Sequence, residues 1–200
     1  MGAVFNHIND ARQFIVDKLS DDALLGRNGY MMREGTYIID YDPSQQAYAA
    51  DLIHVICEHD LPDRGVTPIE VNLYDLVLQR LDNDGVWERI VQAEAVVERS
   101  DLIRMLEGAA DAKGYLASKV IEAIEAHGDA DIAFVTGIGE TFPYVRTGNL
   151  LSGLSPKIPI VLVFPGSYEH FADGTTSVNI LGLKQNLGSG YYRATRVFDL

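Results

Sequence analysis

Two apolar runs decide the fold, Asp131-Ile-Ala-Phe-Val-Thr136 and Ile158-Pro-Ile-Val-Leu-Val-Phe164. Each has the length and composition of a buried β-strand, and each ends in a turn, Gly137-Ile-Gly139 after the first and Pro165-Gly-Ser167 after the second. An amphipathic segment separates them, so the pattern predicts a βαβ unit with two parallel strands. Partners and ligands of open sheets meet the loops at the carboxyl ends of such strands, and we therefore look for a functional site there.

The alternation of strand and helix patterns extends toward both ends of the chain. Helical spacing of apolar residues predicts helices over 7–25, 44–59, 74–81, 86–127 (two helices divided near 100–101 or 108) and 147–154, and extended runs cover 37–39, 69–73, 177–182 and 192–198. Ser44 is the expected cap of the second helix, because its hydroxyl can accept from first-turn N–H groups.

This order predicts an α/β protein, a single layered domain over residues 1–200 with a mainly parallel sheet. The expected sheet is Rossmann-like or P-loop-like and lacks a Walker A loop, with N-terminal and mid-chain helices added to it. Right-handed crossovers would place Asp40, Gly137 and Pro165 along one edge of the sheet.

The composition is typical of a globular cytoplasmic protein. The 200 residues are 47% hydrophobic, which is enough for a sizeable core. No run of about 18 apolar residues predicts a membrane span, and the first ten residues lack the features of a signal peptide. Cys57 is the only cysteine, so neither a disulfide framework nor a thiolate zinc site is expected.

The net charge of −13 is unevenly distributed. Residues 1–130 hold 24 acidic and 11 basic side chains, whereas residues 131–200 hold five of each. Phosphate backbones bind through clustered Lys and Arg, so direct nucleic-acid binding is not expected. The acidic part is interpreted as a solvated surface or as a face that meets a basic partner protein.

Phosphate chemistry finds no support in the glycine loops. A P-loop needs Gly-Lys followed by Ser or Thr, and this tripeptide does not occur in the chain. Gly137 and Gly139 match the first half of a dinucleotide fingerprint, but Phe142 stands where its third glycine is required. Nucleotide hydrolysis and a nucleotide cofactor are therefore not expected.

Metal and nucleophile patterns are equally weak. His54 and Glu58, one helical turn apart, would supply two ligands at most, and no Gly-x-Ser-x-Gly elbow is present. Cys57 falls on the apolar side of its predicted helix, which favours an inert core thiol. These patterns predict that the chain is not an enzyme and holds no metal.

Tyrosine and arginine near the C-terminus favour an interface. Tyr191-Tyr-Arg193 and Arg196 combine residue types that are enriched at binding hot spots. The alternative is a plain strand in which Tyr192 and Phe198 enter the core and Arg193 faces solvent. Arg146 has a similar pair of interpretations, either as a binding residue or as an ion-pair partner of Glu140 in its own loop.

Four blocks of the C-terminal third occur in a distinctive order: Thr136-Gly-Ile-Gly-Glu-Thr-Phe-Pro-Tyr-Val-Arg146, Asn149-Leu-Leu151, Pro159-Ile-Val-Leu-Val-Phe-Pro-Gly-Ser-Tyr168 and Tyr191-Tyr-Arg-Ala194. Together they resemble the BrxB family, small proteins of bacterial BREX phage-defence systems that form a domain of unknown function. The resemblance implies an accessory component that works alongside a methyltransferase, an ATPase and a PglZ-like protein of the alkaline-phosphatase superfamily. It implies no catalytic residues.

The expected function is that of a non-catalytic adaptor that binds another BREX protein, with the PglZ-like subunit as the expected partner. No cofactor is expected, and a homodimer is compatible with the sequence. The candidate interaction residues are Glu140, Tyr144, Arg146, Tyr168, Tyr191, Arg193 and Arg196, and the candidate structural loop positions are Gly137, Gly139, Pro143, Pro165 and Gly166.

Two alternative functions stay open from the sequence. In the first, the chain is a nucleotide or small-molecule sensor whose loops 137–139 and 165–167 line one pocket, with Asp40, Glu140 and Arg146 as polar contacts. In the second, Tyr191 and the arginines at 146, 193 and 196 make weak contact with a nucleic acid.

Overall fold

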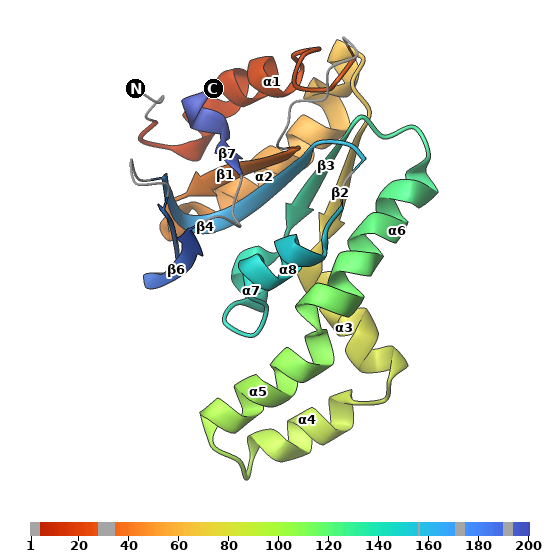
Figure 1. The fold of residues 1–200 in the computed structure, drawn as a ribbon, viewed down its shortest axis with the longest axis vertical. Helices are drawn as coiled ribbons and strands as arrows, with labels where there is room; N and C mark the ends of the chain where they lie inside the picture. Colours follow the sequence, from red (N-terminus) through yellow and green to blue (C-terminus); the bar gives the residue numbers. More distant parts are fainter. Residues whose placement is uncertain (1–4, 28–34, 156, 171–174, 190–193) are drawn as a thin grey trace.

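A computed structural model describes residues 5–27, 35–155, 157–170, 175–189 and 194–200. Parallel strands form the centre of its sheet in the order β2-β3-β4-β1-β7 (Figure 1). They are β1 (Thr36–Tyr41), β2 (Pro68–Asn72), β3 (Ile132–Thr136), the first half of β4 (Ile160–His170) and β7 (Thr195–Arg196). β3 and β4 are parallel neighbours with Ala133 opposite Ile160, so the predicted βαβ unit is confirmed. The α/β class with a mainly parallel sheet is confirmed with it.

Helices cover both faces of this sheet (Figure 1). The described helices are α1 (Arg12–Leu19), α2 (Gln46–Val55), α3 (Leu73–Asn83), α4 (Trp87–Glu94), α5 (Arg99–Ala110), α6 (Ala117–His127), α7 (Ile138–Thr141) and α8 (Thr147–Gly153). From β1 the chain crosses to β2 at the far edge and then returns through β3 to β4. Because crossovers in both directions are right-handed, the two sets of helices lie on opposite faces.

A hydrophobic core lies on each face of the sheet. α1 and α2 pack on the face that carries Phe134 and Val163, while α3, α6 and α8 pack on the face that carries Val135 and Leu162. Successive residues of a strand point to opposite faces, which is why neighbouring residues of β4 belong to different cores.

β4 does not end where the sequence predicts. Pro165 and Gly166 were expected to be loop positions, but β4 runs through them and pairs antiparallel with β5 (Thr175–Ile180), which in turn pairs with β6 (Leu183–Ser189). Gly166 has a φ of 151°, and a Cβ on it would overlap the backbone carbonyl of Asn179. The glycine therefore lets the strand pass from the parallel sheet into the antiparallel hairpin instead of stopping it.

Helices differ from the prediction in three places. The helix predicted over 7–25 is a 3₁₀ turn, η1 (Ile8–Ala11), followed by α1, which ends at Leu19. The turn η2 (Pro43–Gln45) that leads into α2 is capped by Asp42 and not by Ser44, because the Asp42 carboxylate accepts the Ser44 N–H at 2.8 Å. The segment 86–127 forms three helical pieces where two were predicted, with breaks at 95–98 and at Asp111. Asp111 takes a φ of 39°, and its carboxylate accepts the N–H of Gly114 at 3.1 Å. Aspartate tolerates this left-handed conformation and can bond its own backbone, so it interrupts the helix.

α4 and α5 form a helical hairpin that extends beyond the end of the sheet (Figure 1). Leu102 and Leu106 of α5 pack against the core on the side of α3, and Ile90 of α4 is buried beside them. The hairpin is thus anchored along one side, while its other side lies away from the body.

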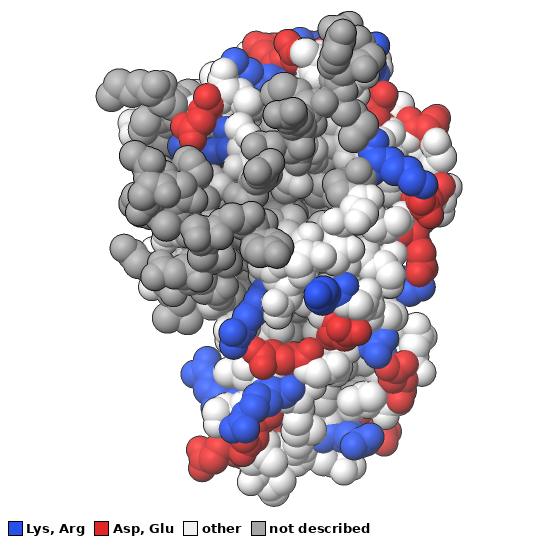
Figure 2. Space-filling model, in the orientation of Figure 1, with Lys and Arg blue, Asp and Glu red and all other residues white. Residues whose placement is uncertain are grey.

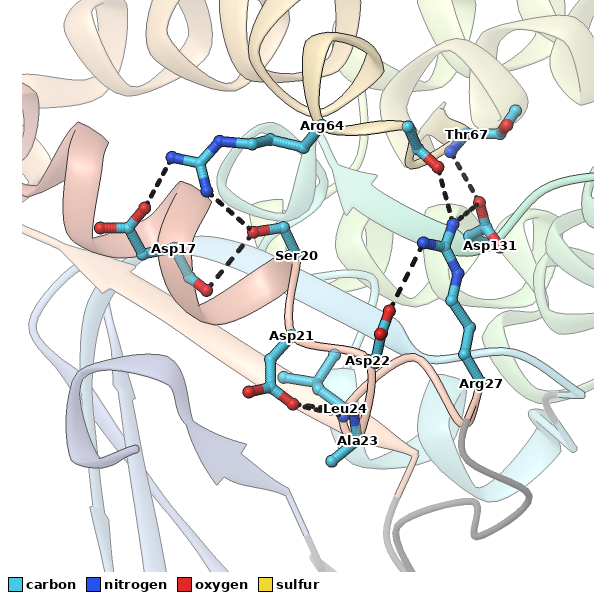
Figure 3. A network of polar contacts seen from close by, with 11 residues as sticks. Asp17, Ser20, Asp21, Asp22, Ala23, Leu24, Arg27, Arg64, Thr67 and Asp131 are labelled. Carbon is cyan, nitrogen blue, oxygen red and sulfur yellow. Dashed lines mark hydrogen bonds and ion pairs between the residues drawn. The ribbon is translucent and has the colours of Figure 1, made fainter.

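Ion pairs tie the N-terminal helix to the amino edge of the sheet (Figure 3). Arg64 donates to Asp17 at 2.7 Å. Arg27 donates to Asp131 at 2.8 Å, and the same carboxylate accepts the Thr67 N–H at 2.8 Å. Both ion pairs lie at the edge of the sheet opposite to the candidate site.

Candidate interaction site at the carboxyl edge of the sheet

The carboxyl ends of β1 and β3 and of the parallel first half of β4 lie along one edge, as expected from the sequence. Asp40 pairs in register with Phe164, one residue before Pro165, and Gly137 follows directly after β3. In an open sheet this edge is the usual place for a ligand or a partner.

Asp40 is the organising charge of this edge. Only 6% of the residue is exposed, and a buried carboxylate needs partners for both oxygens. Its Oδ1 accepts from Arg196 Nε at 2.6 Å, and its Oδ2 accepts from the Tyr168 N–H at 3.0 Å. The Tyr168 hydroxyl donates to the carbonyl of Ala194 at 2.9 Å. Tyr168 and Arg196 therefore tie β1, β4 and β7 together, and both the Tyr168 hydroxyl and the Arg196 Nε have internal partners.

The glycines after β3 are required by space and backbone conformation. Gly137 has a φ of 72°, and a Cβ on it would overlap Asn72 Oδ1, the atom that caps α3 by accepting the Tyr74 N–H at 2.9 Å. A Cβ on Gly139 would crowd the ring of Pro165. The Gly-x-Gly sequence thus allows the close approach of β2, β3 and β4 at this edge, which is its expected structural role.

Three candidate interaction residues, Glu140, Tyr144 and Arg146, lie on the loop after β3. Glu140 is exposed and accepts a hydrogen bond from Gln46 Nε2 at 2.5 Å. Tyr144 is half-buried and donates from its hydroxyl to the Glu140 carbonyl at 3.4 Å; burial, with Tyr74 and Glu140 nearby, raises the pKa of Tyr144 to about 12. Pro143 lies between them on the same loop and is half-buried.

Arg146 does not pair with Glu140, so the alternative of an ion pair within the loop is wrong. Val145 and Thr147 on either side are buried, and the Arg146 side chain is 62% exposed. Its Nη2 lies 3.3 Å from Oε1 of Glu107 on α5. This contact joins the loop to the helical hairpin, a relation that no local sequence signal could have indicated.

Four side chains around the loop after β3 are here called the loop surface: Tyr74, Glu140, Tyr144 and Arg146. Tyr74, in the first turn of α3, is 38% exposed and close enough to Tyr144 to contribute to its raised pKa. No sequence pattern singles out Tyr74, because its position depends on how α3 meets the loop after β3. Tyr191 and Arg193, the other candidates, lie outside the described residues.

In the part of the chain that the structure describes, the loops at 137–139 and 165–167 line two separate hollows and no common pocket. A hollow of about 60 Å³ lies among Glu70, Asn72, Thr136 and Glu140, and Thr136 Oγ1 donates to Glu70 at 2.7 Å across it. A second hollow, of about 360 Å³, is lined by the residues Phe5, Asp40, Asp42, Gly166, Ser167 and Arg196, among others. Small-molecule sites usually have roughly 300–1,000 Å³, so only the second has a suitable size. Arg146 lines neither hollow.

Reactive groups are sparse among the described residues. No three side chains of His, Cys, Asp or Glu in that part of the chain lie close enough to hold a metal ion. Cys57 is buried as predicted, and desolvation, with Glu70 and Glu58 nearby, raises the pKa of its thiol far above the usual value. No helix of the described part has both the length and the apolar character needed to cross a bilayer.

The fold and this edge define an open, mainly parallel α/β-sheet protein. The chain belongs to the BrxB family: the family model, described as BREX protein BrxB, matches residues 69–197, from β2 to the C-terminal turn. The resemblance seen in the four sequence blocks is thereby confirmed. The chain is accordingly a component of a BREX defence system.

Two relatives match nearly the whole chain. A protein of Bacillus cereus named BREX protein BrxB is 27% identical over 199 residues, which cover 96% of this chain and 98% of the relative. A protein of Escherichia coli with the same name is 25% identical over 189 residues, covering 92% of this chain and 88% of the relative. No solved structure shows a significant match.

Proposed function

We propose that this chain is a non-catalytic adaptor of a BREX complex that binds another BREX protein through the loop surface. The observation that carries the proposal is the grouping of Tyr74, Tyr144 and Arg146 at the carboxyl edge, with Arg146 62% exposed. Tyrosine and arginine dominate binding hot spots, because they combine a large contact area with hydrogen-bonding groups.

The loop surface is held in place by contacts that cost little to rearrange. The ion pair of Arg146 with Glu107 is exposed to solvent, and such pairs contribute about 0–1 kcal/mol. Arg146 can therefore exchange Glu107 for a carboxylate of a partner at small cost. We propose the PglZ-like subunit of the alkaline-phosphatase superfamily as that partner, since an adaptor without chemistry of its own acts by positioning an enzyme.

The test is a pull-down of the purified chain with each BREX protein, followed by sizing of any complex. We expect the PglZ-like protein to be captured in a defined ratio, and Arg146→Ala and Tyr144→Ala each to weaken capture about tenfold. Lys157→Ala is the matched control, because it also removes one positive charge and one exposed ion pair, with Glu125, at another surface. Wild-type protein that captures none of the BREX proteins at micromolar concentration would disprove the adaptor function.

A second candidate function rests on the hollow of about 360 Å³ beside Asp40 and Ser167. Its size and its place at the carboxyl edge suit a small molecule. A ligand that binds only the folded state raises the melting temperature, so a nucleotide panel tests this candidate by thermal shift. An unchanged melting temperature across the panel would count against nucleotides. Nucleic-acid contact is not proposed, because the chain has a net charge of −13 and Arg196 already pairs with the buried Asp40.

A further inference from the structure

The α4–α5 hairpin carries an unusual share of exposed apolar surface. Seven large apolar side chains are exposed in the described part of the chain, and four of them lie on this hairpin: Trp87, Val91, Val96 and Met105, exposed by 45%, 50%, 82% and 37%. Trp87 is the only tryptophan of the chain. A single exposed apolar residue needs no explanation, but a group that includes tryptophan marks an interaction surface.

The geometry of α4 places two of these side chains together. Trp87 and Val91 are four residues apart, so they are neighbours on one side of the helix. Ile90 of the same helix is 7% exposed and points toward α5 and the core. α4 therefore has two apolar sides: the side with Ile90 packs against the core, and the side with Trp87 and Val91 is exposed. Glu94, a further turn along, continues the exposed side.

Acidic side chains border this apolar surface. Residues 82–110, the hairpin with the turn that leads into it, hold seven acidic and three basic side chains. Ion pairs occupy three of the acids, Asp84 with Arg80, Asp101 with Arg104 and Glu107 with Arg146. Among the described residues no cation pairs with the other four, which are Asp82, Glu88, Glu94 and Glu98. Figure 2 shows charged side chains set among uncharged surface on the lobe that α4 and α5 form.

We propose that the α4–α5 hairpin docks onto a protein partner that offers an apolar groove bordered by Lys and Arg side chains. The apolar side of α4 would enter the groove, and Glu88 and Glu94 would meet the basic border. A second copy of the chain fits less well, because two hairpins with an acidic surplus repel each other. Anionic partners, such as nucleic acids or lipid headgroups, are disfavoured by the same charge.

The proposal adds a second binding face to the adaptor, and it rests on the proposed function only because the partner is sought among the BREX proteins. One face would then hold the PglZ-like subunit through the loop surface, and the other would hold a basic-edged subunit. An adaptor needs two such faces if it is to bring two proteins together.

The test measures the affinity of the purified chain for each BREX protein separately, with Trp87→Ala, a Glu88→Lys/Glu94→Lys double variant and a control. Tyr48→Ala is the control, since Tyr48 on α2 is an exposed aromatic residue (52%) away from the hairpin. For one BREX protein we expect Trp87→Ala to weaken binding at least tenfold and the double variant to weaken it as well. Tyr48→Ala should bind like the wild type. Rising salt should also weaken binding of the wild-type protein.

Each other outcome overturns the proposal. If the hairpin variants bind as tightly as the wild type while Arg146→Ala loses binding, the hairpin proposal fails and the proposed function stands. If the wild-type chain binds no BREX protein, both fail. If sizing shows a wild-type dimer that Trp87→Ala converts to a monomer, the occupant of the surface is a second copy. Circular dichroism of each variant confirms that the substitutions, all on exposed side chains, leave the fold intact.

Discussion

A buried carboxylate is stable only when it is paired, and Asp40 takes both partners from the C-terminal part of the chain. Arg196 contributes a charged donor, and Tyr168 contributes a backbone N–H. The Arg196 guanidinium also lies over the Phe198 ring, 4.9 Å from its centroid. One acidic residue thereby fixes the positions of β4 and β7 beside β1.

Removing this carboxylate should destabilise the protein substantially. We expect Asp40→Ala to lower the free energy of unfolding by about 3 kcal/mol, because it removes the buried carboxylate that accepts from the partly buried Arg196 guanidinium and from the Tyr168 N–H. Urea unfolding followed by circular dichroism measures the loss. Asp199→Ala is the control, since Asp199 lies 3.9 Å from the same arginine but is 53% exposed. Equal losses for the two variants would refute the central role assigned to Asp40.

At the scale of single residues, the sequence could not predict which contacts the candidate residues make. It singled out Arg196 and Tyr168 as interaction candidates, whereas the structure engages both internally. The burial of Asp40 could not be foreseen, because it depends on strands more than a hundred positions away in the sequence. The expected absence of phosphate chemistry stays a prediction, which rests on Phe142 at the position of the third glycine of the fingerprint.

At the scale of elements, some strands and helices could be predicted from the sequence and others could not. The strands β1, β2 and β3 and the helices α3 and α8 follow the predicted ranges closely, because alternation and helical spacing are local signals. The continuation of β4 through Pro165 and Gly166 was missed, since both residues normally signal a turn. A single division near 100–101 or 108 was predicted, whereas the structure has two breaks, at 95–98 and at Asp111. The segment contains no proline to mark either of them, and the break at Asp111 depends on an aspartate cap.

The N-cap of α3 positions one residue of the loop surface, Tyr74. Asn72 Oδ1 accepts the N–H of Tyr74 at 2.9 Å and thereby holds the first turn that presents Tyr74. We expect Asn72→Ala to cost about 1 kcal/mol of unfolding free energy, the usual value of a lost N-cap. It should also weaken capture of the BREX partner. Asn72→Ser, which keeps an accepting oxygen, should retain both properties, and equal behaviour of Ala and Ser would argue against this link.

The molecule as a whole should lose stability in acid. Hydrogen bonds from Arg64 and Gln13 lower the pKa of Asp17, and a hydrogen bond from Arg12 lowers the pKa of Asp60. A carboxylate with a lowered pKa in the folded state contributes stability above its unfolded pKa of about 3.9, and this contribution is lost as the pH falls through the folded pKa. The urea concentration at the midpoint of unfolding should therefore decrease as the pH is lowered from 5 to 2.

The Asp17→Asn/Asp60→Asn double variant separates these two groups from the other carboxylates. We expect it to flatten the acid limb of the stability curve and to unfold at lower urea concentration than the wild type at pH 7. Parallel curves for the variant and the wild type would show that the acid sensitivity comes from other groups.

The order of the strands has a consequence for how the protein is made. β1 finds both of its neighbours, β4 and β7, only in the last fifth of the chain, with Ile38 opposite Leu162 and Arg196. During translation both edges of β1 stay unpaired until β4 and β7 have been synthesised. Pairings between segments so distant in the sequence also form slowly. During this time the carboxylates concentrated in residues 1–130 make nascent chains repel one another. The acidic residues 1–130 would thus act as a safeguard against aggregation until β7 emerges and pairs with β1.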